Sequence, residues 1–174
     1  MSHDLHKLIG GTVLKEVPGG VLLDEACGGG QQLPLFCSLN KGRDTQFCKV
    51  DLLVLQNNKV RVVMEIEESN IKPTQIGGKF ITTALSSHFC HDRLEKSCAM
   101  AESVLFIQVV DGSKLKKQSQ KPNQFKKLGI QIQNVIPLKN SSVKEYRLFI
   151  WSKRESKKVL SDIVKAIKNA LRMV

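Results

Sequence analysis

Apolar and polar positions alternate along the chain in a pattern that predicts strands interspersed with helices. The clearest segment is residues 46–68, where two apolar, β-branched runs flank the turn 56–59. Such a pattern predicts a β-hairpin, and apolar side chains on both faces indicate a buried place in the sheet. Further strands are expected over residues 33–39, 103–110 and 146–151.

Helical periodicity marks several other segments. Pro73 can begin a helix, and the apolar residues that follow predict a helix over 73–90, with a second one to 101 as an option. Residues 155–173 form an amphipathic pattern with one apolar stripe. Residues 3–16 have near-helical spacing interrupted by Gly10-Gly11, which predicts a short helix or a broken turn. A loop plus a helix is expected over 113–128. The order of elements predicts an α/β sandwich with a mixed sheet.

Length and composition set the class of protein. The 174 residues suit a single domain, 1–174, and 41% hydrophobic with 25% charged residues excludes a disordered chain, a collagen or a coiled coil. No apolar run is long enough for a membrane span, and the first 30 residues lack the pattern of a secretory signal. A cytoplasmic protein with no membrane partner is therefore expected. The five cysteines lack CxxC spacing and are interpreted as reduced thiols.

The net charge of +11 comes entirely from the C-terminal half, about 101–174, which has 16 Lys and Arg against five Asp and Glu. Such a basic half favours a polyanion, and nucleic acid over an acidic membrane surface. The residues expected to contact phosphate are Lys114, Lys116, Lys117, Lys121, Lys153 and Arg154. Because few exposed aromatic residues are apparent, duplex DNA is favoured over single strands. The choice between DNA and RNA stays open.

Three carboxylates stand at one end of the predicted hairpin. Glu65 and Glu67 are two apart in a strand and so share a face. Asp51 joins them only in one register. A two-residue turn without a bulge pairs Asp51 with Met64 and turns it to the other face, whereas a three-residue turn or a bulge pairs it with Glu65.

Converging carboxylates in a buried sheet repel one another, and a divalent cation removes that cost. Hard oxygen ligands suit Mg²⁺ or Mn²⁺. We therefore predict that Asp51 and Glu65 bind such a metal. The alternative is that Glu67 and Glu68 face solvent at the strand end.

The segment Val50–Leu55, followed by Val60–Glu67 and a helix, resembles the PD-(D/E)XK nuclease superfamily. The resemblance implies a restriction-endonuclease-like αβββαβ core, with a central mixed sheet flanked by helices. It implies metal binding by Asp51 and Glu65, with Glu67 at the position where the family usually has Lys.

The same resemblance suggests where the missing lysine comes from. Some members of the superfamily supply it from the next helix, where Lys79 shares a face with Gln75. An N-terminal acidic residue assists in some relatives, and Glu16 or Glu25 is the candidate.

Together these features predict a Mg²⁺- or Mn²⁺-dependent endonuclease that hydrolyses DNA phosphodiester bonds, with a restriction-type enzyme as one option. Its catalytic residues would be Asp51, Glu65, Glu67 and Lys79. Cutting both strands requires two sites, so a homodimer is plausible. The alternatives are a non-catalytic nucleic-acid-binding module of the same fold and a subunit whose basic half meets an acidic protein.

Overall fold

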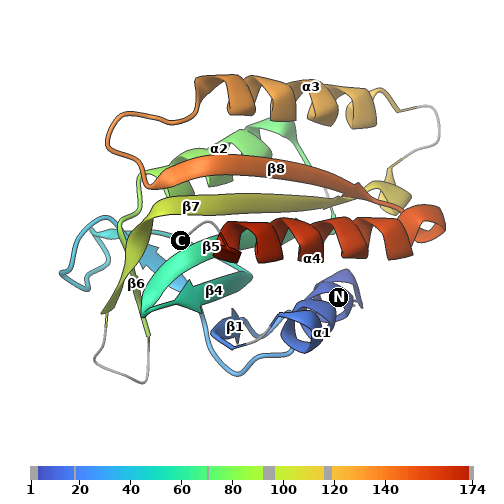
Figure 1. The fold of residues 1–174 in the computed structure, drawn as a ribbon. Coiled ribbons are helices and arrows are strands. Elements are labelled where there is room, and N and C mark those ends of the chain that lie inside the picture. Colours follow the sequence, from blue (N-terminus) through green and yellow to red (C-terminus); the bar gives the residue numbers. More distant parts are fainter. Residues whose placement is uncertain (1–3, 18, 70, 92–96, 116–118, 173–174) are drawn as a thin grey trace.

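The computed structural model describes residues 4–17, 19–69, 71–91, 97–115 and 119–172. These residues form an α/β fold with a mixed, mostly antiparallel open sheet flanked by helices (Figure 1). In chain order the elements are α1 (Asp4–Glu16), β1 (Val21–Leu23), β2 (Pro34–Phe36), β3 (Gln46–Lys49), β4 (Leu52–Gln56), β5 (Lys59–Glu67), α2 (Pro73–Ala84), β6 (His88–Cys90), β7 (Ser97–Asp111), α3 (Lys121–Val135), β8 (Val143–Trp151) and α4 (Ser156–Arg172), with 3₁₀ turns at Gly112–Lys114 and Lys153–Glu155.

The long strand β7 joins the whole sheet together. Its first residues pair antiparallel with β6, which continues to β2 and β3. Its later residues run parallel between β5 and β8, and the antiparallel strands β4 and β1 follow beyond β5. The carboxyl ends of the three parallel strands therefore lie at one edge of the sheet (Figure 1).

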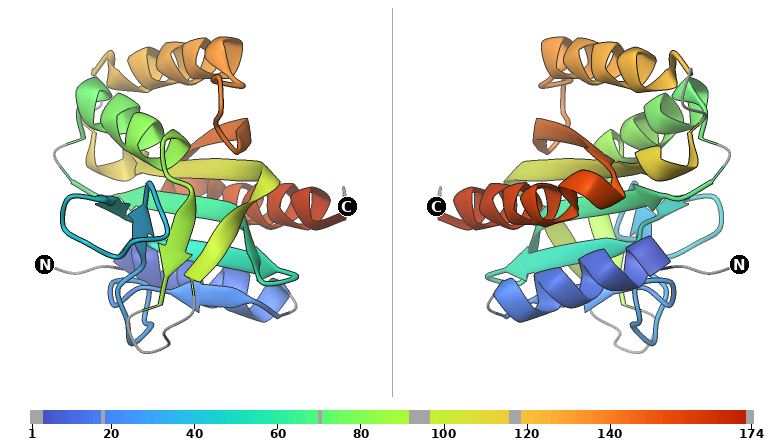
Figure 2. Two further views of the ribbon diagram at one scale, coloured as in Figure 1. Left: turned by 90° about the vertical axis from the view of Figure 1, so that its left-hand side faces the viewer. Right: turned by 90° about the vertical axis from the view of Figure 1, so that its right-hand side faces the viewer.

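Two helices cover each face of the parallel part of the sheet (Figure 2). On one face, α2 and α3 pack against alternate residues of β5 and β7, such as Val63 and Phe106. On the other face, α1 and α4 pack against the intervening residues, such as Met64 and Ile107. Because both faces of β5 and β7 are buried, their sequences are apolar almost throughout, as is usual for parallel strands.

The predicted hairpin is confirmed, and a bulge determines its register. Asn57 and Asn58 both have positive φ, 51° and 57°, which is typical of the two-residue turn that suits the twist of a hairpin. Gln56 pairs with Lys59, but the register shifts after Leu55, so that the extra residue in β5 is Arg61. Beyond the shift, Leu52 pairs with Met64.

The next positions along this register place Asp51 opposite Glu65. The backbone N–H of Asp51 donates to the Met64 carbonyl at 3.2 Å, so the strands remain close at this point. Of the two registers that the sequence left open, the bulged one is present. The bulge thus brings the first carboxylate to the face that carries the other two.

The extra residue itself is anchored. Arg61 is only 7% exposed. Its Nη1 donates to the carbonyl of Ser103 and its Nη2 to the carbonyl of Ala170, both at 2.6 Å. The second carbonyl lies near the C-terminus of α4, where a cation is favoured by the helix dipole. Arg61 therefore ties the bulge to β7 and to α4.

The bounds of one predicted strand and of one predicted helix differ from expectation. Residues 46–55 do not form one arm of the hairpin, because the chain turns at 50–51 and the first part, β3, pairs with β2 instead. The helix over 73–90 ends at Ala84, and a second helix to 101 is wrong. The Ser87 N–H donates to the Phe36 carbonyl, and residues 88–90 then pair with β2 and β7, so sheet pairing replaces the helix.

At the N-terminus, the expected interruption at Gly10-Gly11 is absent, and α1 is continuous. Gly10 lies against Cys27, where a Cβ would come within 2.8 Å of the Cys27 carbonyl oxygen. This glycine therefore permits close packing rather than ending the helix. The short strand β1 had no clear signal in the sequence.

Replacement of Arg61 by Met is expected to lower the free energy of unfolding by about 2–4 kcal/mol, because two buried hydrogen bonds from a charged donor are lost. Urea denaturation measures the change. Lys59→Met removes an exposed cation from the same hairpin and is the matched control. Equal losses in the two variants would contradict the anchoring role of Arg61.

Candidate functional site

The carboxylates of Asp51, Glu65 and Glu67 gather where β5 ends and β4 begins. Glu65 and Glu67 are 1% and 5% exposed, and both face α2. The Asp51 carboxylate accepts a hydrogen bond from the backbone N–H of Ile66 through Oδ2, at 2.6 Å. The strand alternation and the bulge, rather than a loop, therefore position this cluster.

Helix α2 supplies the cation of the cluster. Lys79 Nζ lies 2.6 Å from Glu65 Oε2 and 2.8 Å from Glu67 Oε1. One turn earlier, Gln75 Nε2 donates to Glu67 Oε2 at 2.8 Å. The spacing of four residues that placed Gln75 and Lys79 on one helix face thus brings both to the carboxylates, and Lys79 is not a solvated surface residue.

The position of α2 depends on a buried polar contact. Gln108 lies beside Glu65 in the parallel pairing of β5 and β7. Its Nε2 donates to the Ile76 carbonyl of α2 at 3.3 Å, and its Oε1 accepts from the Tyr146 hydroxyl at 2.7 Å. This connection from β8 through β7 to α2 holds the helix that carries Lys79.

The N-terminus of α1 closes the other side of the cluster. Glu68 Oε1 accepts hydrogen bonds from the backbone N–H groups of Leu5 and His6, which is the usual way to satisfy the first turn of a helix. The His6 ring lies between two carboxylates, 3.6 Å from Asp51 Oδ2 and 3.5 Å from Glu68 Oε1. Glu67 and Glu68 are both buried, so the solvent-facing alternative is wrong.

Burial and neighbouring charges perturb the ionisation of this site. Burial raises the pKa of Glu65 well above its ordinary value, the charge of Asp51 adds to this, and Lys79 opposes it. Burial alone would lower the pKa of Lys79, but Glu65 and Glu67 outweigh it and raise the pKa, so the ammonium stays charged. Burial also acts to lower the pKa of His6, and Asp51 and Glu68 reverse the shift to a net rise.

An acidic residue from the N-terminal part does approach Asp51, but it is Asp24. Its N–H donates to the Asp51 carbonyl at 3.0 Å, and burial together with the charge of Asp51 raises its pKa. Of the two predicted candidates, Glu25 is exposed. Glu16 lies ten residues after His6, about 15 Å along α1, and pairs with Lys168 at 3.8 Å.

Three residues of the cluster were not found from the sequence: His6, Asp24 and Glu68. His6 and Asp24 come from segments far from the hairpin, and no spacing rule connects them to it. Glu68 follows Glu67 directly in the sequence, but the alternation of side chains along a strand predicts that Glu68 points away from the cluster.

The donor atoms suit a hard divalent cation in part. Asp51 and Glu65 offer carboxylate oxygens, and Glu65 Oε1 is buried with no hydrogen-bond partner among the described residues. A buried oxygen of this kind is costly without a partner, and a cation would satisfy it. Within the same part of the chain, no three His, Cys, Asp or Glu side chains are grouped to hold a metal ion. The cation that Glu65 and Glu67 share is Lys79.

Cations predicted to contact phosphate lie at the same sheet edge. Lys114 Nζ lies 3.8 Å from both Glu68 Oε2 and Asp111 Oδ2, and Lys121 Nζ donates to the Ile71 carbonyl at 3.0 Å. Both lysines line a cavity of about 440 Å³ beside Glu68. Lys153 and Arg154 are exposed in the 3₁₀ turn after β8. Two further candidates, Lys116 and Lys117, lie outside the described residues.

Comparison with known proteins gives no relative. The chain matches no model of a protein family, no curated protein and no solved structure. In the described part of the chain, none of the helices is long and apolar enough to cross a bilayer. The function therefore has to be argued from the geometry of the carboxylate cluster.

The raised pKa of Glu65 predicts a particular pH dependence. The folded chain holds this proton more tightly than the unfolded chain, so the free energy of unfolding should fall as pH rises above about 4.5, the ordinary value. Each unit of raised pKa corresponds to about 1.4 kcal/mol. Glu65→Gln should flatten this fall in urea denaturation between pH 5 and 8, whereas Glu102→Gln, at an exposed site, should follow the wild type. Parallel curves for Glu65→Gln and wild type would refute the assignment.

Proposed function

We propose that the protein is a metal-dependent nuclease that hydrolyses phosphodiester bonds of duplex DNA at the cluster of Asp51, Glu65, Glu67 and Lys79. The observation that carries the proposal is the bulged register, which sets Asp51 opposite the buried Glu65 while α2 presents Lys79 to the same face. Two carboxylates can hold a divalent cation, and a lysine beside them can stabilise charge on a phosphoryl oxygen.

The order of elements supports a restriction-endonuclease-like core. Helix α1 precedes the antiparallel strands β1, β4 and β5, and α2 then crosses to β7, which runs parallel to β5. Apart from the pair β2–β3 inserted after β1 and the short strand β6 before β7, this is the αβββαβ order that the resemblance implies.

In this proposal Asp51 and Glu65 would hold Mg²⁺ or Mn²⁺, which would lower the pKa of a bound water and balance charge on the phosphate. The Ile66 N–H and His6 hold the Asp51 carboxylate in place. Gln75 orients Glu67, which positions the attacking water.

Lys79 has a separate part in the reaction. Its side chain contacts the buried carboxylates and is 31% exposed, so it borders both the cluster and the solvent from which a substrate arrives. There it stabilises the negative charge that develops on the phosphate. Lys114, Lys121, Lys153 and Arg154 bind neighbouring phosphates along the same sheet edge.

A non-catalytic DNA-binding module is the second candidate. The observation in its favour is that Lys79 already neutralises Glu65 and Glu67, and that the described residues offer no group of three metal ligands. In that case the carboxylates only hold α2 against the sheet through their ion pairs with Lys79, and the cations at the sheet edge bind DNA without catalysis.

Plasmid cleavage tests the proposal directly. With Mg²⁺ or Mn²⁺ the wild type should nick or cut supercoiled plasmid, and EDTA should abolish the reaction. Asp51→Asn and Glu65→Gln should each reduce the rate by about 100-fold or more, because metal catalysis contributes several kcal/mol. Glu102→Gln is the control and should cut at the wild-type rate. If the wild type and every variant bind DNA in a salt-sensitive way but none of them cuts it, the non-catalytic DNA-binding module is supported instead.

Thermal unfolding tests whether the metal and Lys79 neutralise the negative charge of the same carboxylates. In EDTA, Lys79→Met should lower Tm, because Glu65 stays buried without its cation. Adding Mg²⁺ should raise Tm more in Lys79→Met than in wild type, because binding to the folded state stabilises it. Lys72→Met, an exposed cation just before the same helix, should respond as wild type. Equal Mg²⁺ shifts in Lys79→Met and wild type would argue against a metal at Glu65.

A further inference from the structure

Helix α4 carries five cations on one side, two near its start and three toward its end. At about 100° per residue, they fall within an arc of roughly 100°, while Val159, Ile163 and Ile167 face the sheet from the opposite side. We call these five cations the α4 basic face: Lys157, Lys158, Lys165, Lys168 and Arg172. From first to last the face extends about 22 Å along the helix.

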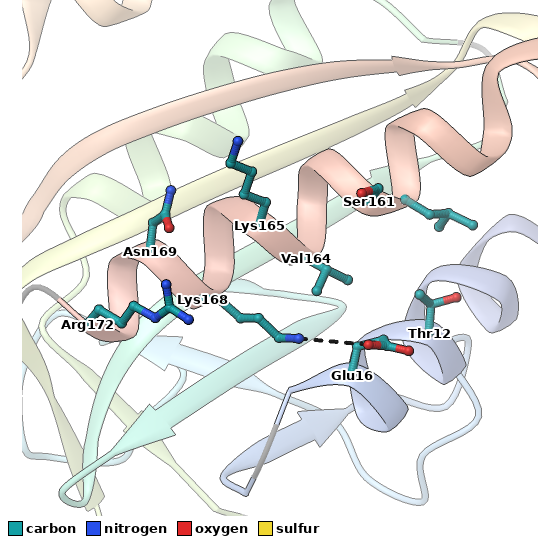
Figure 3. Close-up of a pocket in the computed structure, with 9 residues that line it drawn as sticks. Thr12, Glu16, Ser161, Val164, Lys165, Lys168, Asn169 and Arg172 are labelled. Carbon is teal, nitrogen blue, oxygen red and sulfur yellow. Dashed lines mark ion pairs between the residues drawn. The ribbon is translucent and has the colours of Figure 1, made fainter.

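The far end of this face borders a groove against α1. The groove has a volume of about 540 Å³, and its α1 side is formed by Thr12 and Glu16. In Figure 3, Lys168 extends from α4 toward Glu16, and the two lie 3.8 Å apart. Lys165 and Arg172 also line the groove, and neither has a carboxylate partner among the described residues. Two of the three cations are therefore available to an anionic ligand.

The chemistry of the groove suits a phosphate backbone. Besides the cations, it presents the hydroxyl group of Ser161 and the amide of Asn169, whereas the Thr12 hydroxyl donates to the Leu8 carbonyl. Lys, Arg, Ser, Thr and Asn side chains are the usual partners of phosphate oxygens. None of its nine lining residues is aromatic, so it offers no platform on which bases would stack.

The α4 basic face is continuous with the candidate catalytic edge. Helix α4 begins directly after the turn that holds Lys153 and Arg154, at the carboxyl end of β8. The ends of β5, β7 and β8 lie side by side there, and Glu67 terminates the first of them. The cations thus lead from the carboxyl edge of the sheet along α4 to the groove.

We propose that the α4 basic face and the α1–α4 groove bind the phosphate backbone of duplex DNA beyond the phosphodiester that is cut. The proposal rests on the proposed function in placing DNA at the carboxylate edge. At 3.4 Å per base pair, 22 Å adds contacts over about six or seven base pairs. The contacts are electrostatic and independent of base sequence.

The experiment measures duplex binding in EDTA, in the Asp51→Asn background, with a 24-base-pair DNA over a series of salt concentrations. The test variant is Lys165→Gln/Lys168→Gln/Arg172→Gln, which keeps long side chains on α4. Loss of the two available cations, Lys165 and Arg172, should reduce the slope of log Kobs against log salt by about 2. Affinity at low salt should fall at least tenfold.

The matched control removes three cations elsewhere: Lys41→Gln/Lys49→Gln/Lys139→Gln, at exposed positions away from α4. Its slope should change by less than about 1, as expected when no phosphate contact is lost. If the test and control variants bind alike, the proposal is overturned. Lys165→Glu alone is the second variant, since Lys165 is exposed and has no ion-pair partner within the described ranges. It should weaken duplex binding by charge repulsion, and unchanged binding would overturn the proposal. Circular dichroism confirms that each variant is folded.

Poly-glutamate serves as a probe for an acidic protein partner. If the triple variant loses poly-glutamate binding but keeps wild-type affinity for DNA, the groove is a protein-docking surface and the proposal is overturned. The result is also separable from cleavage. If the triple variant reduces the salt slope but the wild type never cuts DNA, the α4 site is supported and the nuclease is rejected. If the wild type cuts DNA but the triple variant leaves the slope unchanged, the nuclease is supported and the α4 site is rejected.

Discussion

One extra residue in β5 determines which side chains meet at the candidate site. Without the bulge at Arg61, the two-residue turn would pair Asp51 with Met64 and direct its carboxylate to the face covered by α1 and α4. The bulge instead sets Asp51 opposite Glu65. A buried arginine, bonded to carbonyls of β7 and near the end of α4, holds this register. The chemistry at one end of the hairpin therefore depends on packing at the other end.

Charge balance explains why three elements, α2, α1 and β5, converge on so small a volume. Buried carboxylates need cations or N–H donors, and each element supplies some. Helix α2 gives Lys79 and Gln75, the start of α1 gives backbone donors to Glu68, and β5 gives the Ile66 N–H to Asp51. Among the described residues, Glu65 Oε1 nevertheless stays buried without a hydrogen-bond partner. A cation beside this oxygen would satisfy it, which is the argument for a metal site.

Local patterns in the sequence identified what depends on neighbouring residues. They located the hairpin, the shared face of Glu65 and Glu67, and the shared face of Gln75 and Lys79, because these follow from periods of two and of about four. Contacts that depend on the tertiary arrangement were not available to such reasoning. The bulge was only one of several options, Asp24 and His6 come from distant segments, and residues 88–90 left the helical pattern because a neighbouring strand was there to pair with them.

The two adjacent glycines of α2 affect how the site moves. A Cβ on Gly77 or Gly78 would meet nothing within 4 Å, so no packing requires either glycine. Each lowers the intrinsic stability of the helix by up to about 1 kcal/mol relative to Ala. Amide hydrogens of α2 should therefore exchange with solvent through local opening well before those of β5 and β7. Each opening moves Gln75 and Lys79 away from the carboxylates together, while the sheet that aligns the carboxylates stays intact.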